Sequence, residues 1–149
     1  LAVAEKRRSR AGGTSRFVEG DALRLPVRSA SVDVVTVGYG LRNIADPAAA
    51  IREMRRALAP GGRVVVLDFG KPDNRLAAAL YGAFLKSVMP AMGWLFHGDP
   101  ETYAYIPASL ERYPAQRGVA ALMEEAGLVN VRFENGLLGT MGFNVGERP

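Results

Sequence analysis

Apolar residues gather along this chain in short runs that alternate with segments of helical periodicity. Residues 32–37 and 63–69 are almost continuously apolar and rich in valine, a pattern typical of buried strands. Between them, apolar residues recur at three- and four-residue steps over 50–58, which predicts an amphipathic helix. Asp46 before Pro47 provides a side-chain cap and a favoured first residue for that helix.

The rest of the chain continues this alternation of helices and strands. We expect helices over 1–10 and 115–126, strands over 16–19 and 128–134, and a last edge strand over 141–145. Helix-sized connections between apolar strands favour parallel pairing, with helices on both faces of the sheet. The predicted fold is therefore α/β, an incomplete doubly wound sheet of Rossmann-like type.

One segment departs from this regular pattern. From Leu76 to Phe96 only Lys86 and Ser87 are strongly polar, so the segment is long enough to cross a membrane. Pro90 and the central Lys86 argue against a span. An all-apolar helix should lie between the sheet and a partner subunit, a long hydrophobic substrate or a membrane surface, with burial in the core as the alternative. The aromatic stretch 103–107 is expected to be a loop.

The composition of the chain excludes several kinds of functional site. The chain has 149 residues, 48% hydrophobic and 23% charged, which is ordinary for one domain. With no cysteine and the single His97, neither a disulfide framework nor a bound metal is expected. The net charge of +4 is concentrated in residues 1–16, which we interpret as a solvated helix face rather than a nucleic-acid site. No signal-peptide pattern is visible, so the expected location is the cytoplasm.

Polar residues that follow the predicted strands are candidates for a binding site. Asp21 can accept a hydrogen bond and the amide of Ala22 can donate one, a pair that matches an adenine edge. A plain turn at the strand end is the alternative for Asp21. Gly38 permits close approach of the backbone to a ligand, or it only shapes a turn.

Candidates for catalysis are few. Arg42 beside Asn43 offers planar donors to an oxyanion, although an ion pair with Asp46 would account for the arginine equally. His97 is a candidate base, but its position suits a helix end or a hydrogen-bonded structural residue. Ser109 has no Gly-x-Ser-x-Gly context, so a hydrolase nucleophile is not supported.

Several motifs together resemble a known family. In chain order they are Gly20-Asp21-Ala22, Leu25-Pro26, Ser31-Val32-Asp33, Gly40-Leu41-Arg42-Asn43, Glu53-Met54, Pro60-Gly61-Gly62-Arg63 and Leu67-Asp68-Phe69. This series resembles the class I S-adenosylmethionine-dependent methyltransferases. Gly40-Leu41-Arg42-Asn43, with Tyr103-x-Tyr105-Ile106-x-x-Ser109 and Pro114, more narrowly resembles the ubiquinone/menaquinone biosynthesis C-methyltransferase family.

The resemblance implies cofactor contacts at matched positions. The adenine of S-adenosylmethionine would be held at Asp21 and Ala22, in agreement with the donor and acceptor pair above. Gly38 stands where the family usually has a serine, so only its backbone could contact the cofactor. Tyr39 could face the sulfonium as a cation and aromatic pair. The family requires no metal.

The resemblance also implies a reaction, which is C-methylation of a polyprenylated quinol ring. Arg42 and Asn43 match the residues that would stabilise the ring oxyanion or orient a proton-accepting water, and Tyr105 and Ser109 match the substrate loop. The apolar segment 76–96 would shelter the isoprenoid tail, and contact with a membrane surface is a further expectation. Alternatives are a methyltransferase for another small molecule and a non-catalytic docking module. A nicotinamide oxidoreductase lacks support, since no phosphate-binding fingerprint is visible.

The resemblance further implies that residues 1–149 form the C-terminal portion of one methyltransferase domain. The first strand and Gly-rich loop would precede Leu1, so this chain alone is expected to bind cofactor weakly and to be inactive. An incomplete sheet would also favour self-association through its exposed edge. Asn144 stands where the family has a histidine.

Overall fold

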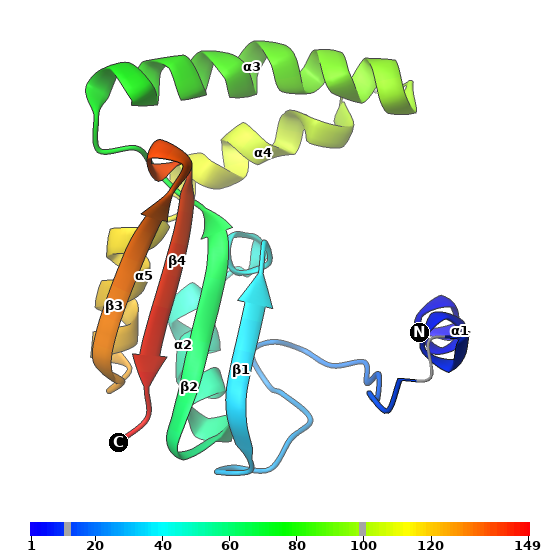
Figure 1. The fold of residues 1–149 in the computed structure, drawn as a ribbon, viewed down its shortest axis with the longest axis vertical. Coiled ribbons are helices and arrows are strands. Elements are labelled where there is room, and N and C mark those ends of the chain that lie inside the picture. Colours follow the sequence, from blue (N-terminus) through cyan, green and yellow to red (C-terminus); the bar gives the residue numbers. More distant parts are fainter. Residues whose placement is uncertain (11–12, 99–100) are drawn as a thin grey trace.

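A mixed α/β fold is seen in the computed structural model, which describes residues 1–10, 13–98 and 101–149. Its sheet has four strands in the order β1-β2-β4-β3 (Figure 1). The strands are β1 (Val32–Gly38), β2 (Leu58–Phe69), β3 (Val129–Gly136) and β4 (Met141–Glu147). The predicted α/β class and the partial, Rossmann-like sheet are confirmed.

Strand β4 occupies an interior position that the sequence did not predict. β1 pairs with β2 in parallel, as expected, with Val35 opposite Val64. β4 then runs antiparallel to both β2 and β3, with Val65 opposite Val145. The prediction of a last edge strand was therefore wrong. Once inserted, β4 has backbone partners on both sides, which satisfies its polar groups more fully than an edge would.

Two amphipathic helices bury their apolar stripes against the same face of the sheet. These are α2 (Pro47–Ala57) and α5 (Ala115–Glu125), which both lie behind the strands in Figure 1. Asp46 caps α2 as predicted, accepting a hydrogen bond from Ala49 N at 2.9 Å. The core between these helices and β2 includes fully buried Ile51 and Val66. Helices on both faces were expected, but within the described residues the helices that pack on the sheet cover one face.

Helices α3 (Arg75–His97) and α4 (Glu101–Arg112) form a pair that lies across the carboxyl ends of β1 and β2 (Figure 1). The expected helix over 76–96 is confirmed. The prediction of a loop over 103–107 was wrong, because this stretch is the middle of α4, with Pro107 inside the helix. Burial of Ile106 and Leu110 in the core stabilises α4 despite the proline.

The first part of the chain lies outside the sheet. Helix α1 (Ala2–Arg10) confirms the predicted helix, buries none of its residues and stands apart from the strands (Figure 1). Residues 13–20 form no regular structure, so the strand expected over 16–19 was wrong. A strand needs a neighbour for its backbone groups, and this segment pairs with no described strand.

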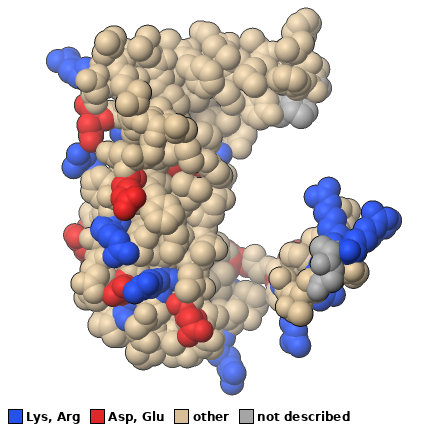
Figure 2. Space-filling model, viewed as in Figure 1, with Lys and Arg blue, Asp and Glu red and all other residues tan. Residues whose placement is uncertain are grey.

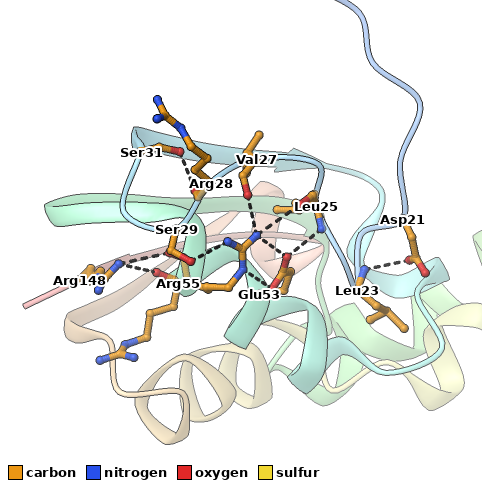
Figure 3. A network of polar contacts seen from close by, with 11 residues as sticks. Asp21, Leu23, Leu25, Val27, Arg28, Ser29, Ser31, Glu53, Arg55 and Arg148 are labelled. Carbon is orange, nitrogen blue, oxygen red and sulfur yellow. Dashed lines mark hydrogen bonds and ion pairs between the residues drawn. The ribbon is translucent and has the colours of Figure 1, made fainter.

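A polar network fastens the following coil to helix α2 (Figure 3). Glu53 accepts a hydrogen bond from Leu25 N at 2.8 Å and forms an ion pair with Arg56 at 2.7 Å. Arg56 in turn donates to the carbonyl oxygens of Leu25 and Val27. The hydrogen bond from the Arg56 guanidinium lowers the pKa of Glu53 below its ordinary value, and the Leu25 N–H adds to this effect.

Candidate active site

The site begins where β1 ends, beneath α3 and α4. Tyr39 follows β1 with φ at 53°, and its N–H donates to Leu67 O of β2 at 2.8 Å. This positive φ is unusual for a tyrosine. It turns the chain into the short 3-10 helix η1 (Leu41–Asn43), which carries both predicted catalytic residues.

A buried ion pair fixes the side chain of Arg42. Its Nη1 lies 3.0 Å from Asp68 Oδ1, and the side chains are only 4% and 2% exposed. The backbone N–H of Arg42 also donates to Asp68 Oδ2, at 3.2 Å. The sequence left open a pairing of Arg42 with Asp46, but the structure pairs it with Asp68. In a site of low dielectric such a pair needs further hydrogen bonds to be stable.

Several neighbours complete the setting of the Arg42 guanidinium. Nη1 donates to Tyr39 O at 2.7 Å, and Nη2 donates to the hydroxyl of Tyr105 at 3.3 Å. The guanidinium carbon lies 4.8 Å from the ring centroid of Phe69, within cation–π range. Nε is buried and has no hydrogen-bond partner among the described residues. Because a buried donor without a partner costs free energy, an acceptor at this position would be stabilising.

A cavity of about 450 Å³ adjoins this arginine. It lies between η1, the start of α2 and one face of α4. Its lining includes the predicted residues Arg42, Asn43, Tyr105 and Ser109, together with Arg112, Tyr113 and Pro114. The structure thus gathers both predicted catalytic residues and both predicted substrate residues around one space, although they come from separate parts of the sequence.

The two predicted substrate residues differ in what they can do. Tyr105 accepts from Arg42, so its hydroxyl hydrogen stays available to donate to a bound molecule. Ser109 already donates its hydroxyl to Ile106 O at 2.8 Å, which leaves it mainly an acceptor. Asn43 is held loosely, with its Nδ2 3.5 Å from Tyr39 O.

Sequence reasoning missed Asp68, Arg112 and Tyr113. Asp68 directly follows the apolar run of β2, and this position at a strand end was the signal that could have identified it. Tyr113 is 4% exposed, and burial raises its pKa well above the usual range, with Asp68 adding to the effect. It will therefore remain neutral at physiological pH.

The predicted cofactor residues fall into two groups. Asp21 and Ala22 lie in the coil before β1 and outside the cavity, and Asp21 Oδ1 accepts from Leu23 N in a local turn (Figure 3). Gly38 and Tyr39 lie at the carboxyl end of β1, where a Cβ on Gly38 would meet no atom within 4 Å. Tyr39 is 41% exposed, and its ring centroid lies 5.2 Å from that of Phe69. The end of β1 is therefore open on the side of Gly38, and an aromatic ring is exposed beside it.

A second cavity, of about 280 Å³, lies between α3 and α4 on the opposite face of α4. Its walls are mostly apolar and include Tyr81, Leu85 and Leu110, with Lys86 at its border. Burial raises the pKa of Tyr81 in the wall of this cavity, and the positive charge of Arg42 opposes that shift electrostatically.

Two other sequence candidates have no place in this site. Asn144 is buried in β4 and donates to Gln116 O at 2.7 Å, which is a structural contact. The side chain of His97 lies outside the described residues, so its suggested role as a base stays a prediction.

Comparisons with known proteins identify the family of this chain. Residues 1–148 match the sequence model of the ubiE/COQ5 methyltransferase family. The chain is 40% identical to the demethylmenaquinone methyltransferase of Thermus thermophilus over 149 residues, all of this chain and 67% of the relative. It is also 40% identical to the ubiquinone/menaquinone biosynthesis C-methyltransferase UbiE of Stutzerimonas stutzeri, over 92% of this chain and 54% of that protein. The chain thus spans little more than half of the second relative.

Solved structures confirm the fold at lower identity. A SAM-dependent methyltransferase from Aquifex aeolicus superposes with a TM-score of 0.61 at 16% identity, covering 99% of this chain and 62% of that chain. An O-methyltransferase family protein from Burkholderia thailandensis gives a TM-score of 0.65 at 19% identity, over 99% of this chain and 40% of that one. The resemblance read from the sequence motifs is confirmed: this chain belongs to the ubiE/COQ5 methyltransferase family.

Proposed function

We propose that the protein containing this chain transfers a methyl group from S-adenosylmethionine to a ring carbon of a polyprenylated quinol. The observation that carries the proposal is the buried Arg42 guanidinium, whose Nε lacks a partner among the described residues and whose cavity also holds Tyr105. The names of the two relatives support quinone-ring methylation. Both the menaquinone and the ubiquinone pathways are consistent with this site.

The chemistry sets a clear demand on the protein. When bound, S-adenosylmethionine supplies an electrophilic methyl group, and Gly38 and Tyr39 are the residues proposed to hold it, with Asp21 and Ala22 at its adenine. The quinol ring must first lose a hydroxyl proton, because the resulting oxyanion donates electron density to the ring carbon. That carbon forms the new C–C bond as the carbon–sulfur bond breaks, and then releases its hydrogen as a proton. Stabilising the oxyanion is therefore the main task of the site.

Arg42 is suited to this task because it is preorganised. Asp68 and the Tyr39 carbonyl hold Nη1 on one side of the guanidinium, which leaves Nε and the Nη2 edge for a substrate oxygen. Asp68 acts as a positioning residue that keeps this planar group oriented. Fixed donors of this kind need no reorganisation as charge develops in the transition state.

Neighbouring side chains complete the proposed substrate contacts. The Tyr105 hydroxyl accepts from Arg42 and can donate to the same ring oxygen. Asn43 borders the cavity and can orient the water that takes up the ring proton. Ser109 would accept from the second hydroxyl of the quinol. No residue in this set needs to change its charge during the reaction.

The isoprenoid tail also has a candidate site. The apolar cavity between α3 and α4, about 280 Å³ in volume, is large enough for the first units of the tail. The two cavities lie on opposite faces of α4, so the tail would pass around this helix. This arrangement refines the expectation that segment 76–96 shelters the tail.

The test is a methyl-transfer assay of the full-length protein with S-adenosylmethionine and demethylmenaquinol. Arg42→Ala should lower kcat by about 10²- to 10³-fold, the usual effect of losing an oxyanion donor. Arg63→Ala is the matched control, since Arg63 pairs with Glu147 away from the cavity, and it should retain full activity. Unchanged turnover of Arg42→Ala would instead favour the docking module considered above.

A further inference from the structure

Tyr113 is a buried residue that the reaction proposed above leaves unused. It directly follows α4, is 4% exposed and lines the cavity that also holds Arg42. We propose that its hydroxyl donates a hydrogen bond to the second ring oxygen of the quinol, and that this bond makes the site selective for rings with two opposite oxygens. The inference rests on the proposed function and adds a substrate-binding residue to it.

The Tyr113 hydroxyl has a free hydrogen-bonding capacity. It forms no hydrogen bond within the part of the chain that the structure describes, whereas the hydroxyl of a buried tyrosine usually does. Nor is it one of the fully enclosed polar atoms without a partner, which are Nε of Arg8 and Nε of Arg42. A hydroxyl that has no partner and is not fully enclosed borders open space, and Tyr113 lines the cavity. A bound acceptor would therefore complete its hydrogen bonding.

Tyr113 can act only as a neutral donor. Burial raises the pKa of its hydroxyl well above its ordinary value of 10.0, and the charge of Asp68 adds to this shift while that of Arg42 opposes it. The phenol therefore keeps its proton at physiological pH. Because a neutral donor stabilises an oxyanion less than a guanidinium does, the oxyanion should form at Arg42 and the second oxygen should remain a hydroxyl.

One side of α4 carries the polar groups of the cavity wall. Tyr105, Ser109 and Arg112 all line the cavity and follow one another at steps of four and three residues, so they share a side of the helix. Helical hydrogen bonding continues as far as Tyr113, whose N–H donates to Ser109 O at 3.2 Å. Tyr113 thus lies just over two turns beyond Tyr105, about 12 Å along the helix axis.

This spacing along α4 is of the size that a quinol needs. Donors to the two opposite oxygens of such a ring are roughly 11 Å apart, when each hydrogen bond spans about 2.8 Å. Arg42 and Tyr105 would hold the first oxygen, at one end of the ring, and Tyr113 the second. Ser109 lies between the two tyrosines and can accept the hydrogen of the second hydroxyl.

Charge is a weaker means of recognition at this end of the cavity. Arg112 borders the cavity but is exposed, so solvent screens its charge. None of the described residues that line the cavity is an aspartate or a glutamate. Figure 2 shows the arm formed by α3 and α4 as almost uncharged on the face in view. Hydrogen bonding to a neutral hydroxyl is therefore the recognition that fits.

The test is calorimetric titration of the full-length protein, under nitrogen, with 1,4-dihydroxynaphthalene and with 1-naphthol, which lacks the second oxygen. The wild type should bind 1,4-dihydroxynaphthalene about tenfold more tightly, since one hydrogen bond distinguishes the two probes. In Tyr113→Phe this preference should fall to about threefold or less, because only Ser109 then contacts the second hydroxyl. Tyr103→Phe is the matched control, because Tyr103 belongs to α4 but lines neither cavity, and it should keep the wild-type preference.

Kinetics and stability distinguish substrate binding from a structural role. The bond from Tyr113 does not change during methyl transfer, so Tyr113→Phe should raise KM for a short-tailed demethylmenaquinol about fivefold and leave kcat nearly unchanged. Its Tm should stay within about 2 °C of the wild type, because the lost hydroxyl had no protein partner. A fall in Tm with an unchanged KM would show a structural role and overturn the proposal.

The remaining outcomes separate this inference from the proposed reaction. A wild type without preference between the probes, including one that binds neither, would overturn the role of Tyr113, as would an equal preference in Tyr113→Phe. If the wild type still methylates demethylmenaquinol, the proposed reaction stands in those cases. A preference that depends on Tyr113 in a protein without methyl transfer would refute the reaction and support the role of Tyr113 in binding the ring.

Discussion

Arg42 and Asp68 form an ion pair with 3.0 Å between Nη1 and Oδ1, and both side chains are almost completely buried. The pair is neutral as a unit, so Arg42 contributes directed hydrogen bonds rather than a free positive charge. Its direction toward the cavity depends on Asp68, the Tyr39 carbonyl and the Tyr105 hydroxyl together.

Asp68→Asn should both destabilise the protein and impair catalysis. The substitution leaves the Arg42 guanidinium buried without a counter-charge, which costs about 3 kcal/mol of unfolding free energy. Thermal unfolding and kcat at saturating substrate are the measurements. If Asp68 positions Arg42, Asp68→Glu should recover part of kcat and not only stability. A purely structural role would leave kcat per folded molecule unchanged in both variants.

Tyr105→Phe and Ser109→Ala should have unequal effects on methyl transfer. Tyr105→Phe removes both the acceptor of Arg42 and a donor to the substrate oxygen, so we expect kcat to fall at least tenfold. Ser109 already donates to Ile106 O, so Ser109→Ala should change kcat less than threefold. Equal losses in the two variants would contradict the assigned roles of these hydroxyls.

Glu53→Gln should loosen the coil that precedes β1. Arg56 holds the pKa of Glu53 below its ordinary value of 4.5, so the ionised carboxylate stabilises the folded state. This stability is present above about pH 4.5 and is lost as the pH falls through the lower folded pKa. At pH 7 the substitution should reduce Tm by about 3 °C. The gap in Tm between wild type and variant should close in acid, as measured by circular dichroism, and a constant gap would contradict this account.

Tyr113 should make the protein sensitive to alkali. Burial raises the folded pKa of this phenol above its ordinary value of 10.0. The unfolded chain therefore loses its proton first, and stability falls as the pH rises past about 10 toward the folded value. Urea unfolding at pH 8 and pH 11 should show a smaller difference for Tyr113→Phe than for the wild type.

The free edge of β1 should drive self-association of the 149-residue chain. β1 pairs only with β2 in the described sheet, and Val34 on it is 54% exposed. An unpaired parallel edge with exposed valine is a template for another chain. Light scattering across a concentration series should show oligomers that Val34→Lys reduces. A strict monomer at high concentration would refute this expectation.

Secondary-structure elements that are set by neighbouring residues were predicted correctly from the sequence. The valine run of β1, the Asp46 cap and the apolar stripe of α2 were all correctly placed, because cap chemistry and periodicity act over a few residues. The stretch 103–107 was expected to be a loop but is helical, because packing of Ile106 in the core outweighs the tendency of Pro107 to end a helix.

Relationships between distant residues were less predictable. Arg42 lines the cavity, and its partner Asp68 lies 26 residues further along the chain. The pairing follows from the parallel register of β1 and β2, which places Gly38 opposite Leu67. Nothing in the local sequence of 141–145 reveals that β4 enters between two strands, since pairing is decided by the whole sheet.

The interior position of β4 constrains the order in which this domain can assemble during synthesis. β3 reaches the sheet only through β4, although it leaves the ribosome first. Until β4 has been made, β3 has no strand to join, and α5 lacks much of the surface that it covers. In the nascent chain these apolar segments therefore stay exposed to aggregation, unless a chaperone shields them, until β4 joins β3 to the sheet.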